Sequence, residues 1–390
     1  MSDIPHAHGR RARSRTAWLV AAVATVLVAL WSWPRLRAAD TLPPRLDDAE
    51  FWQLIGDVSE PGGTFQSENF LSNETGFQAA IPRLVQITRP DGVYLGVGPE
   101  QNFTYIAATR PKIAFILDIR HQNLIEHLMY KALFELSSNR VDFVARLFGR
   151  KRPAGLDDTS TADELFNTYE RMPIDDEAFA NTLSEMKALL LETHGFAFTG
   201  DDEADFEHVY SVFHDFGPQL NYNSGAGRGR FGRGGGMPTY SQLMTASDRQ
   251  GEKRSYLASE ANYRLIRDLE RRNLIVPLTG DFGGDKALRL VGQYLKAHNA
   301  TVTAFYLSNV ERYLFQITAN QNGGWRKFYE NVAMLPLDAS STFIRSVSGG
   351  VRGGGFGMRL PNVLASMQET LAGVKIGTIR SYDDVFEISR

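Results

Sequence analysis

The sequence predicts an α/β fold in which a sheet rich in parallel strands is flanked by helices. Two apolar runs, GVYLGV at 92–97 and KIAFILDIR at 112–120, are predicted as strands, and the second is typical of a strand buried on both faces. Each run is followed by a predicted helix, QNFTYIAATR at 101–110 and NLIEHLMYKALFELS at 123–137. Alternation of strand and helix is the pattern of a parallel sheet.

The same alternation returns in the second half of the chain. Helices are predicted at 255–273 and 284–300, and strands at 274–282, 301–310, 331–338 and, as an edge strand, 381–388. Between the two halves, from about 139 to 251, the rhythm breaks. The segments 141–153 and 174–196 are predicted as helices, whereas 222–244 is glycine-dense and has no periodicity. We interpret this stretch as a mostly helical, glycine-rich insertion.

The chain begins with a separate part. A basic tail at 1–16, an uncharged apolar run at 17–33 and a proline-bearing linker at 34–46 precede a body at 47–390. At about 1.5 Å per residue, the apolar run is just long enough to cross a hydrocarbon core. We therefore predict a single-pass transmembrane anchor.

The alternative for this run is a cleaved signal peptide, since Ala38 and Ala39 are small. Arg37 stands where such a cleavage site needs a small residue, which favours the anchor. The basic tail then predicts a cytoplasmic amino terminus and an extracytoplasmic body.

Composition excludes several classes of function. The chain of 390 residues has no cysteine, so it has no disulfide, thiolate metal site or cysteine nucleophile. A formal charge of -3, from 42 basic and 45 acidic residues, gives no general reason to expect a nucleic-acid partner. The histidines lack helical ligand spacing, so no metal is expected. An arginine and glycine tract at 225–238 is predicted as a flexible loop, for which a lid over the site is one role.

One stretch carries the chemistry of a binding site. Gly96 and Gly98 lie between the first strand and its helix, where exposed backbone N–H groups and the lack of side chains let a ligand approach. Asp118 ends the next strand, twenty positions after Gly98, where a carboxylate accepts hydrogen bonds from ribose hydroxyls. The combination predicts a nucleotide-type site.

The stretch from Val93 to Arg120 resembles motifs I and II of the class I S-adenosylmethionine-dependent methyltransferases, which have a Rossmann-like fold. The resemblance covers about 81–137 and 274–338. It implies that Gly96 and Gly98 face the methionine part of S-adenosylmethionine and that Asp118 holds the ribose. It also implies that Asp281 and Phe282 lie near the adenine.

The resemblance further implies that Ser308, Asn309 and Glu311, at the end of the predicted strand 301–310, lie on the substrate side. A plain structural alternative is that Asp281 or Asp285 caps the next helix, and Ser308 and Asn309 also fit a helix cap. If the reaction uses a dedicated base, Glu311 and Asp248 are the candidates.

The stretch also departs from the family pattern. Tyr94 stands where the family has an acid, and Glu100 takes the place of the third glycine. A carboxylate at a helix amino end favours a ligand ammonium and disfavours a phosphate, although Glu100 also fits a plain cap. This residue favours S-adenosylmethionine over a dinucleotide.

The predicted function is methyl transfer from S-adenosylmethionine to an unknown acceptor. An extracytoplasmic body conflicts with the supply of that cofactor. The alternatives are therefore a catalytically silent, membrane-tethered ligand-binding or scaffold protein that retains the fold, and a nicotinamide-dependent oxidoreductase.

Overall fold

The structure of the chain, a computed structural model, describes residues 39–224, 237–316, 324–346, 362–387 and 389. The chain divides into two units, Met1–Asp40 and Thr41–Arg390, and the second holds every helix and strand named here. The basic tail, the apolar run 17–33 and most of the tract 225–238 lie outside the described residues. Among the described residues, no helix has the length and apolar character needed to cross a bilayer.

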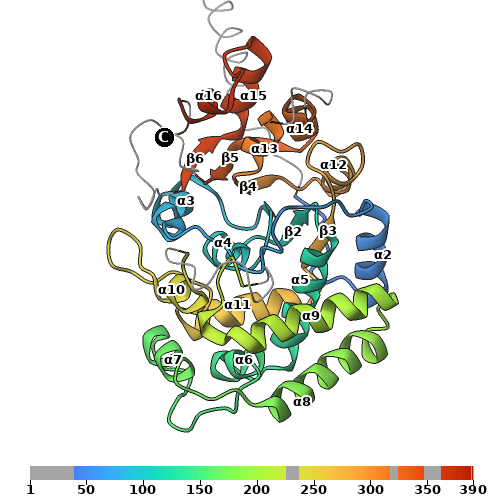
Figure 1. Cartoon of the computed structure of the whole chain (residues 1–390). Coiled ribbons are helices and arrows are strands. Elements are labelled where there is room, and N and C mark those ends of the chain that lie inside the picture. The colour runs from blue at the N-terminus through green and yellow to red at the C-terminus, as the bar shows by residue number, and fades with distance from the viewer. Residues whose placement is uncertain (1–38, 225–236, 317–323, 347–361, 388, 390) are drawn as a thin grey trace, which may run out of the picture. The chain divides into compact units, whose positions relative to one another are not determined.

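In the described part of the chain, six strands form one sheet in the order β3-β2-β1-β4-β5-β6 (Figure 1). Neighbouring strands are parallel from β3 to β5, and β6 runs antiparallel to β5 at the edge. The strands are β1 Val93–Gly96, β2 Ile113–Asp118, β3 Ile275–Thr279, β4 Val302–Ser308, β5 Leu337–Arg345 and β6 Val363–Ser366. The predicted α/β class with a parallel-rich sheet is thereby confirmed.

Helices cover both faces of the sheet, and aromatic contacts identify the faces. On one face, Phe115 of β2 contacts Tyr294 of α12, and Phe305 of β4 contacts Phe328 of α14. On the other face, Tyr306 of β4 contacts Tyr105 of α4. Successive side chains of a strand point to opposite faces, which explains why adjacent residues 305 and 306 meet different helices.

Fifteen α-helices are described in this part of the chain. They are α2 Asp48–Val58, α3 Ile81–Ile87, α4 Gln101–Thr109, α5 His121–Leu136, α6 Arg140–Leu147, α7 Ala162–Tyr169, α8 Asp176–Lys187, α9 Gly200–Phe216, α10 Tyr240–Thr245, α11 Glu260–Arg271, α12 Ala287–Ala297, α13 Val310–Gln316, α14 Gly324–Ala333, α15 Met367–Ile376 and α16 Tyr382–Glu387.

Helix α5 joins the sheet to the helical region. Its residues are buried without a break from Asn123 to Phe134, as expected of a helix covered on all sides. It packs against β2 and β3 and also contacts α6, α8, α9 and α11 (Figure 1). The predicted insertion therefore completes the burial of α5, and its apolar residues belong to the same core as the sheet.

Two boundaries differ from the prediction. The edge strand expected at 381–388 is wrong, because α16 occupies Tyr382–Glu387. The Asp384 carboxylate accepts the N–H groups of Arg380 and Ser381 at 2.8 Å each, which starts a helix there. The strand expected at 331–338 begins only at Leu337, because Asn331 is held in α14 by hydrogen bonds to the carbonyl groups of Phe282 and Gly284.

Candidate functional site

A cavity of about 450 Å³ lies at the carboxyl ends of the parallel strands. Residues that follow β1, β2, β3 and β4 line it, together with a segment that precedes the sheet in the chain. The predicted site residues in its lining are Gly98, Asp118, Asp281, Phe282, Ser308 and Asn309. Its volume is in the range of small-molecule sites.

The place of the cavity follows from the strand order. The chain runs from β1 to β2 to β3 on one side, and then crosses to β4 and β5 on the other side of β1. Loops that leave β1 and β4 therefore diverge and open a crevice at their carboxyl ends. Open parallel sheets bind their ligands at such a switch point.

Gly98 and Asp118 both line this crevice and lie close together in it. Gly98 has a left-handed backbone, with φ at 76°, which favours glycine. A Cβ atom added to it would lie 3.8 Å from Nδ2 of Asn69 and 4.0 Å from Oδ2 of Asp118. The Gly98 carbonyl accepts hydrogen bonds from Asn102 and His127, which fix the turn. Burial lowers the pKa of His127 to about 4, so this histidine is neutral.

Asp118 has a partner that the sequence analysis did not anticipate. The Arg120 side chain binds both carboxylate oxygens at 3.1 Å, and the Arg120 backbone N–H also binds Oδ1 at 2.9 Å. Among the described residues, Oδ2 accepts one hydrogen bond, and it lies on the Gly98 side. This oxygen retains a lone pair for a ligand hydroxyl.

Gly96 does not line the cavity. A Cβ atom on it would come within 1.9 Å of Oδ1 of Asn102, so the glycine makes room for that side chain. The Asn102 amide in turn binds the carbonyl groups of Val97, Gly98 and Pro99. Gly96 therefore shapes the turn from behind, and contact with the methionine part of a ligand is not its role.

Glu100 is also placed away from the cavity, which corrects its assignment as a ligand contact. The residue is fully buried, and its carboxyl group accepts the Ser72 N–H at 3.3 Å. Burial raises the pKa of Glu100 to about 8. At neutral pH the group is uncharged, so it neither attracts a ligand ammonium nor repels a phosphate.

Asp281 and Phe282 line the cavity after β3. The Asp281 carboxylate accepts the Gly283 N–H at 2.8 Å, and the Phe282 ring stacks on Phe305. Neither Asp281 nor Asp285 caps α12. The Glu60 carboxylate does so instead, accepting the N–H groups of Lys286 and Ala287.

Ser308 and Asn309 line the cavity after β4. The pairing of β4 with β5 shifts register between Tyr306 and Ser308, and Ser308 has φ at 49°. A bulge of this kind turns the strand end and re-aims its side chain. The Ser308 hydroxyl donates to Oε1 of Glu74 at 2.5 Å.

The two candidate bases do not reach the cavity. Glu311 is 2% exposed, and its carboxylate pairs with Arg345 at 2.7 and 3.1 Å and accepts the Tyr329 hydroxyl. Asp248 closes a turn by accepting the N–H groups of Gln250 and Glu252, and it pairs with Arg254. Both carboxylates are committed to structure, because each is enclosed by its own partners.

The segment before the sheet was missed by sequence reasoning. Thr64, Phe65, Asn69, Ser72 and Asn73 form one wall of the cavity. The Phe65 ring meets Tyr313 of α13 edge-on, with centroids 5.3 Å apart. No periodicity marks this segment, and only the density of Ser, Asn and Gly around 62–73 signals a loop there.

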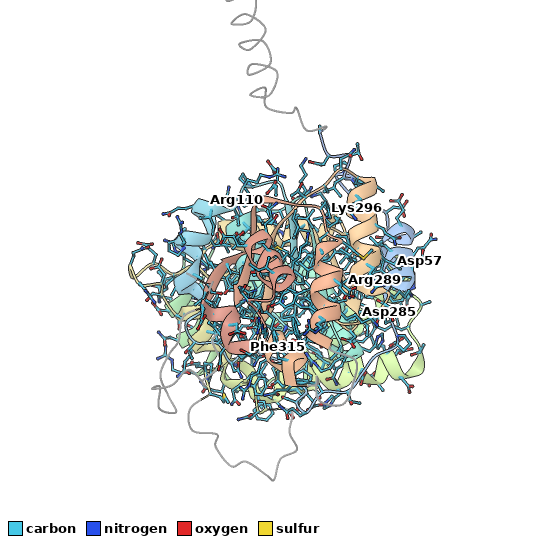
Figure 2. The ribbon with its side chains drawn as sticks, turned by 90° about the horizontal axis from the view of Figure 1, so that it is seen from above. Asp57, Arg110, Asp285, Arg289, Lys296 and Phe315 are labelled. Carbon is cyan, nitrogen blue, oxygen red and sulfur yellow. The ribbon has the colours of Figure 1, made fainter. Side chains whose placement is uncertain are left out.

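Charges in the cavity wall are mixed. Arg120 is paired with Asp118, and Lys327 is paired at 2.6 Å with Asp285. Asp285 also pairs with Arg289, and both of these residues are labelled in Figure 2. Asp281 has no ion-pair partner within the described part of the chain. No group of three or more potential metal-binding His, Asp or Glu side chains occurs among the described residues.

The chain matches a family described as a domain of unknown function (DUF7790) over residues 70–213 and 222–368. These ranges make up well over half of the chain, which therefore belongs to that family. They contain Gly98, Asp118, Asp281 and Ser308. No curated protein matches the chain.

Proposed function

We propose that the cavity binds S-adenosylmethionine and that the protein transfers its methyl group to an acceptor. The observation that carries this proposal is the placement of Gly98 and Asp118 close together in the lining of one crevice at the switch point of the sheet. The strand order β3-β2-β1-β4-β5 supports a Rossmann-like fold, which binds nucleosides at this position.

In the proposed pose, Oδ2 of Asp118 accepts a ribose hydroxyl, and the bare backbone of Gly98 lies against the ligand. Phe282, which is stacked on the core, offers an apolar surface for the adenine. Ser308 and Asn309, which line the cavity at the end of β4, would then lie on the side of the acceptor. Methyl transfer at this centre is mainly a matter of alignment, because the sulfonium is already activated.

The charges of the wall favour this ligand over a dinucleotide. Both cationic side chains, Arg120 and Lys327, have carboxylate partners, so neither is available to neutralise a pyrophosphate. Asp281 adds a negative charge, which suits a ligand that carries a sulfonium and an ammonium. The preference for S-adenosylmethionine over a dinucleotide therefore rests on these wall charges and no longer on Glu100.

Calorimetric titration of the full chain with S-adenosylmethionine, its demethylated product and NAD tests the proposal. We expect the first two to bind and NAD not to bind. Binding of NAD alone would favour the nicotinamide-dependent oxidoreductase. Binding of the demethylated product with no methyl transfer to any acceptor would favour a catalytically silent ligand-binding or scaffold protein.

We also propose that residues 17–33 anchor the protein in a membrane, on the strength of their apolar length and basic flank. The charge bias predicts an extracytoplasmic body. A reporter fused after Arg390 tests this orientation. A cytoplasmic reporter would agree with the supply of S-adenosylmethionine, whereas an extracytoplasmic reporter would favour the silent alternative.

A further inference from the structure

We propose that Ser308 and Glu74 form a proton relay that deprotonates the methyl acceptor, and that this acceptor is a hydroxyl group. The inference rests on the proposed function, because it assigns the base for the same cavity. It replaces Glu311 and Asp248, whose carboxylates are enclosed elsewhere.

The backbone of Ser308 is arranged for a special purpose. A non-glycine residue with φ at 49° is uncommon, and here it coincides with a register shift at the end of β4. Such conformations cluster at functional sites. With this backbone Ser308 lines the cavity, and its hydroxyl reaches Glu74.

Glu74 is a buried carboxylate that receives four hydrogen bonds. The hydroxyl groups of Ser308 and Tyr306 donate to Oε1 at 2.5 and 2.9 Å. The amides of Gln101 and Asn362 donate to Oε2 at 3.0 and 2.7 Å. All four partners donate, and no cation pairs with Glu74 in the described residues, so the carboxylate is held as an acceptor.

Tyr306 does not compete for the proton. Burial, together with the neighbouring charge of Glu74, raises the pKa of the Tyr306 hydroxyl well above its usual range. Tyr306 therefore remains a donor. Of the two hydroxyl groups that donate to Oε1, the one on Ser308 belongs to the last residue of β4 and is therefore nearer to the substrate side.

The relay moves two protons in the same direction, from the acceptor toward Glu74. The acceptor hydroxyl passes its proton to Oγ of Ser308, and Oγ passes its own proton to Oε1 of Glu74. The acceptor oxygen forms a bond to the methyl carbon of S-adenosylmethionine as the carbon–sulfur bond breaks. That bond's electron pair stays on sulfur, which becomes a neutral thioether.

The same geometry selects the class of acceptor. A carboxylate acceptor has no proton to lose, and the negative charge of Glu74 behind Ser308 would repel it. A hydroxyl group is a poor nucleophile until its proton is removed, so it gains most from a base. The rings of Phe65 and Tyr313 in the wall suit an acceptor with an apolar body.

Labelling of the full chain with phenylmethanesulfonyl fluoride tests the relay without knowledge of the acceptor. Oγ of an activated serine attacks sulfur, fluoride leaves, and the proton passes to the base. Peptide mass spectrometry should show Ser308 modified at least about 10-fold faster than Ser72, since each tenfold is only about 1.4 kcal/mol of activation. Ser72 is the matched control, because it lines the same cavity but donates to the amide oxygen of Gln101.

Two variants separate a relay from a structural role. Glu74→Gln should abolish the preference for Ser308, since an amide cannot take the proton. Asn362→Ala removes a donor to the other carboxylate oxygen, and it should leave the preference intact. Equal loss in both variants, or no preference for Ser308 in the unaltered protein, would overturn the relay.

Titration with S-adenosylmethionine distinguishes failure of the relay from failure of the proposed function. Binding without preferential labelling of Ser308 leaves methyl transfer standing and removes the relay. Labelling without binding supports an activated Ser308 and removes its assignment to methyl transfer. The second outcome would redirect the search to reactions in which a serine hydroxyl is itself the nucleophile.

Discussion

The guanidinium of Arg120 binds both carboxylate oxygens of Asp118, with Nε 3.1 Å from Oδ1 and Nη2 3.1 Å from Oδ2. Both residues are at most 6% exposed. The pair holds the carboxylate in one orientation at the tip of β2, with Oδ2 beside Gly98. Arg120 thus positions Asp118, on which the proposed nucleoside site depends. Asp118 in turn supplies the carboxylate partner of the buried Arg120 guanidinium.

Asp118→Ala should weaken S-adenosylmethionine binding and destabilise the protein. Loss of the ribose hydrogen bond should cost about 1.4 kcal/mol, or about 10-fold in Kd. Because Arg120 is then left buried without its partner, the free energy of unfolding should fall by about 3–5 kcal/mol. Calorimetry and urea denaturation measure the two effects. Unchanged affinity in a folded variant would remove Asp118 from the site.

Glu311→Gln should destabilise the protein without changing the affinity for S-adenosylmethionine. The substitution leaves Arg345, which is 1% exposed, without a charged partner, and breaking such a pair costs about 3–5 kcal/mol. Urea denaturation should show the loss, and titration should give an unaltered Kd. A weaker Kd at unaltered stability would return Glu311 to the list of cavity residues.

Glu100→Gln should flatten the dependence of stability on pH. The pKa of Glu100 is raised from 4.5 to about 8, so between these values the native state holds a proton that the unfolded chain releases. The free energy of unfolding therefore falls as pH rises through this window, by up to about 5 kcal/mol. A glutamine still accepts the Ser72 N–H but does not titrate. Urea denaturation at pH 5, 6.5 and 8 should show that the free energy of unfolding of the variant increases relative to that of the unaltered protein as pH rises. Parallel curves for the two proteins would contradict the prediction.

His194→Gln should destabilise the protein at low pH more than at high pH. A hydrogen bond to Glu135 at 3.1 Å raises the pKa of His194, against the opposing effect of burial, and Asp48 at 2.9 Å adds to the rise. This contribution is complete below the ordinary pKa of 6.5 and is lost as pH rises through the folded value. A loss of about 2 kcal/mol is expected at pH 5.5 and a smaller one at pH 9.

His208→Gln is the matched control for the His194 experiment. The His208 imidazole pairs with Glu68 at 2.7 Å, but its side chain is 45% exposed. Exposed pairs contribute little, so this variant should lose less than about 1 kcal/mol. Equal losses in the two histidine variants would mean that burial of the His194 pair is not the cause.

The strand-end residues could be predicted from the sequence because their positions follow from periodicity. Apolar runs locate β1 to β4, and a residue just past a parallel strand must lie at the same edge of the sheet as its neighbours. Gly98, Asp118, Asp281 and Ser308 reach the cavity for this reason. The spacing of the strands in the sequence was enough to predict that these residues lie near one another.

The remaining parts of the site depend on contacts between distant segments. Glu74 lies 234 positions from Ser308, and no local pattern links the two. Glu311 was expected to face the substrate, but its carboxylate points toward Arg345 and accepts a hydrogen bond from it. Glu100 was expected to contact a ligand, but its buried carboxyl group accepts the Ser72 N–H instead. In each case a tertiary contact decides where the side chain points.

The Glu60 carboxylate accepts the N–H groups of Lys286 and Ala287 at the start of α12, although it lies 226 residues before the first of them in the chain. Further upstream, the Thr41 and Leu46 N–H groups bind the carbonyl groups of His298 and Arg272. A shortened version of the protein that starts after residue 46 would therefore remove these donors from two backbone carbonyl groups in its distant half, those of His298 and Arg272. Any soluble version prepared for crystallisation or assay should retain the chain from Thr41 onward.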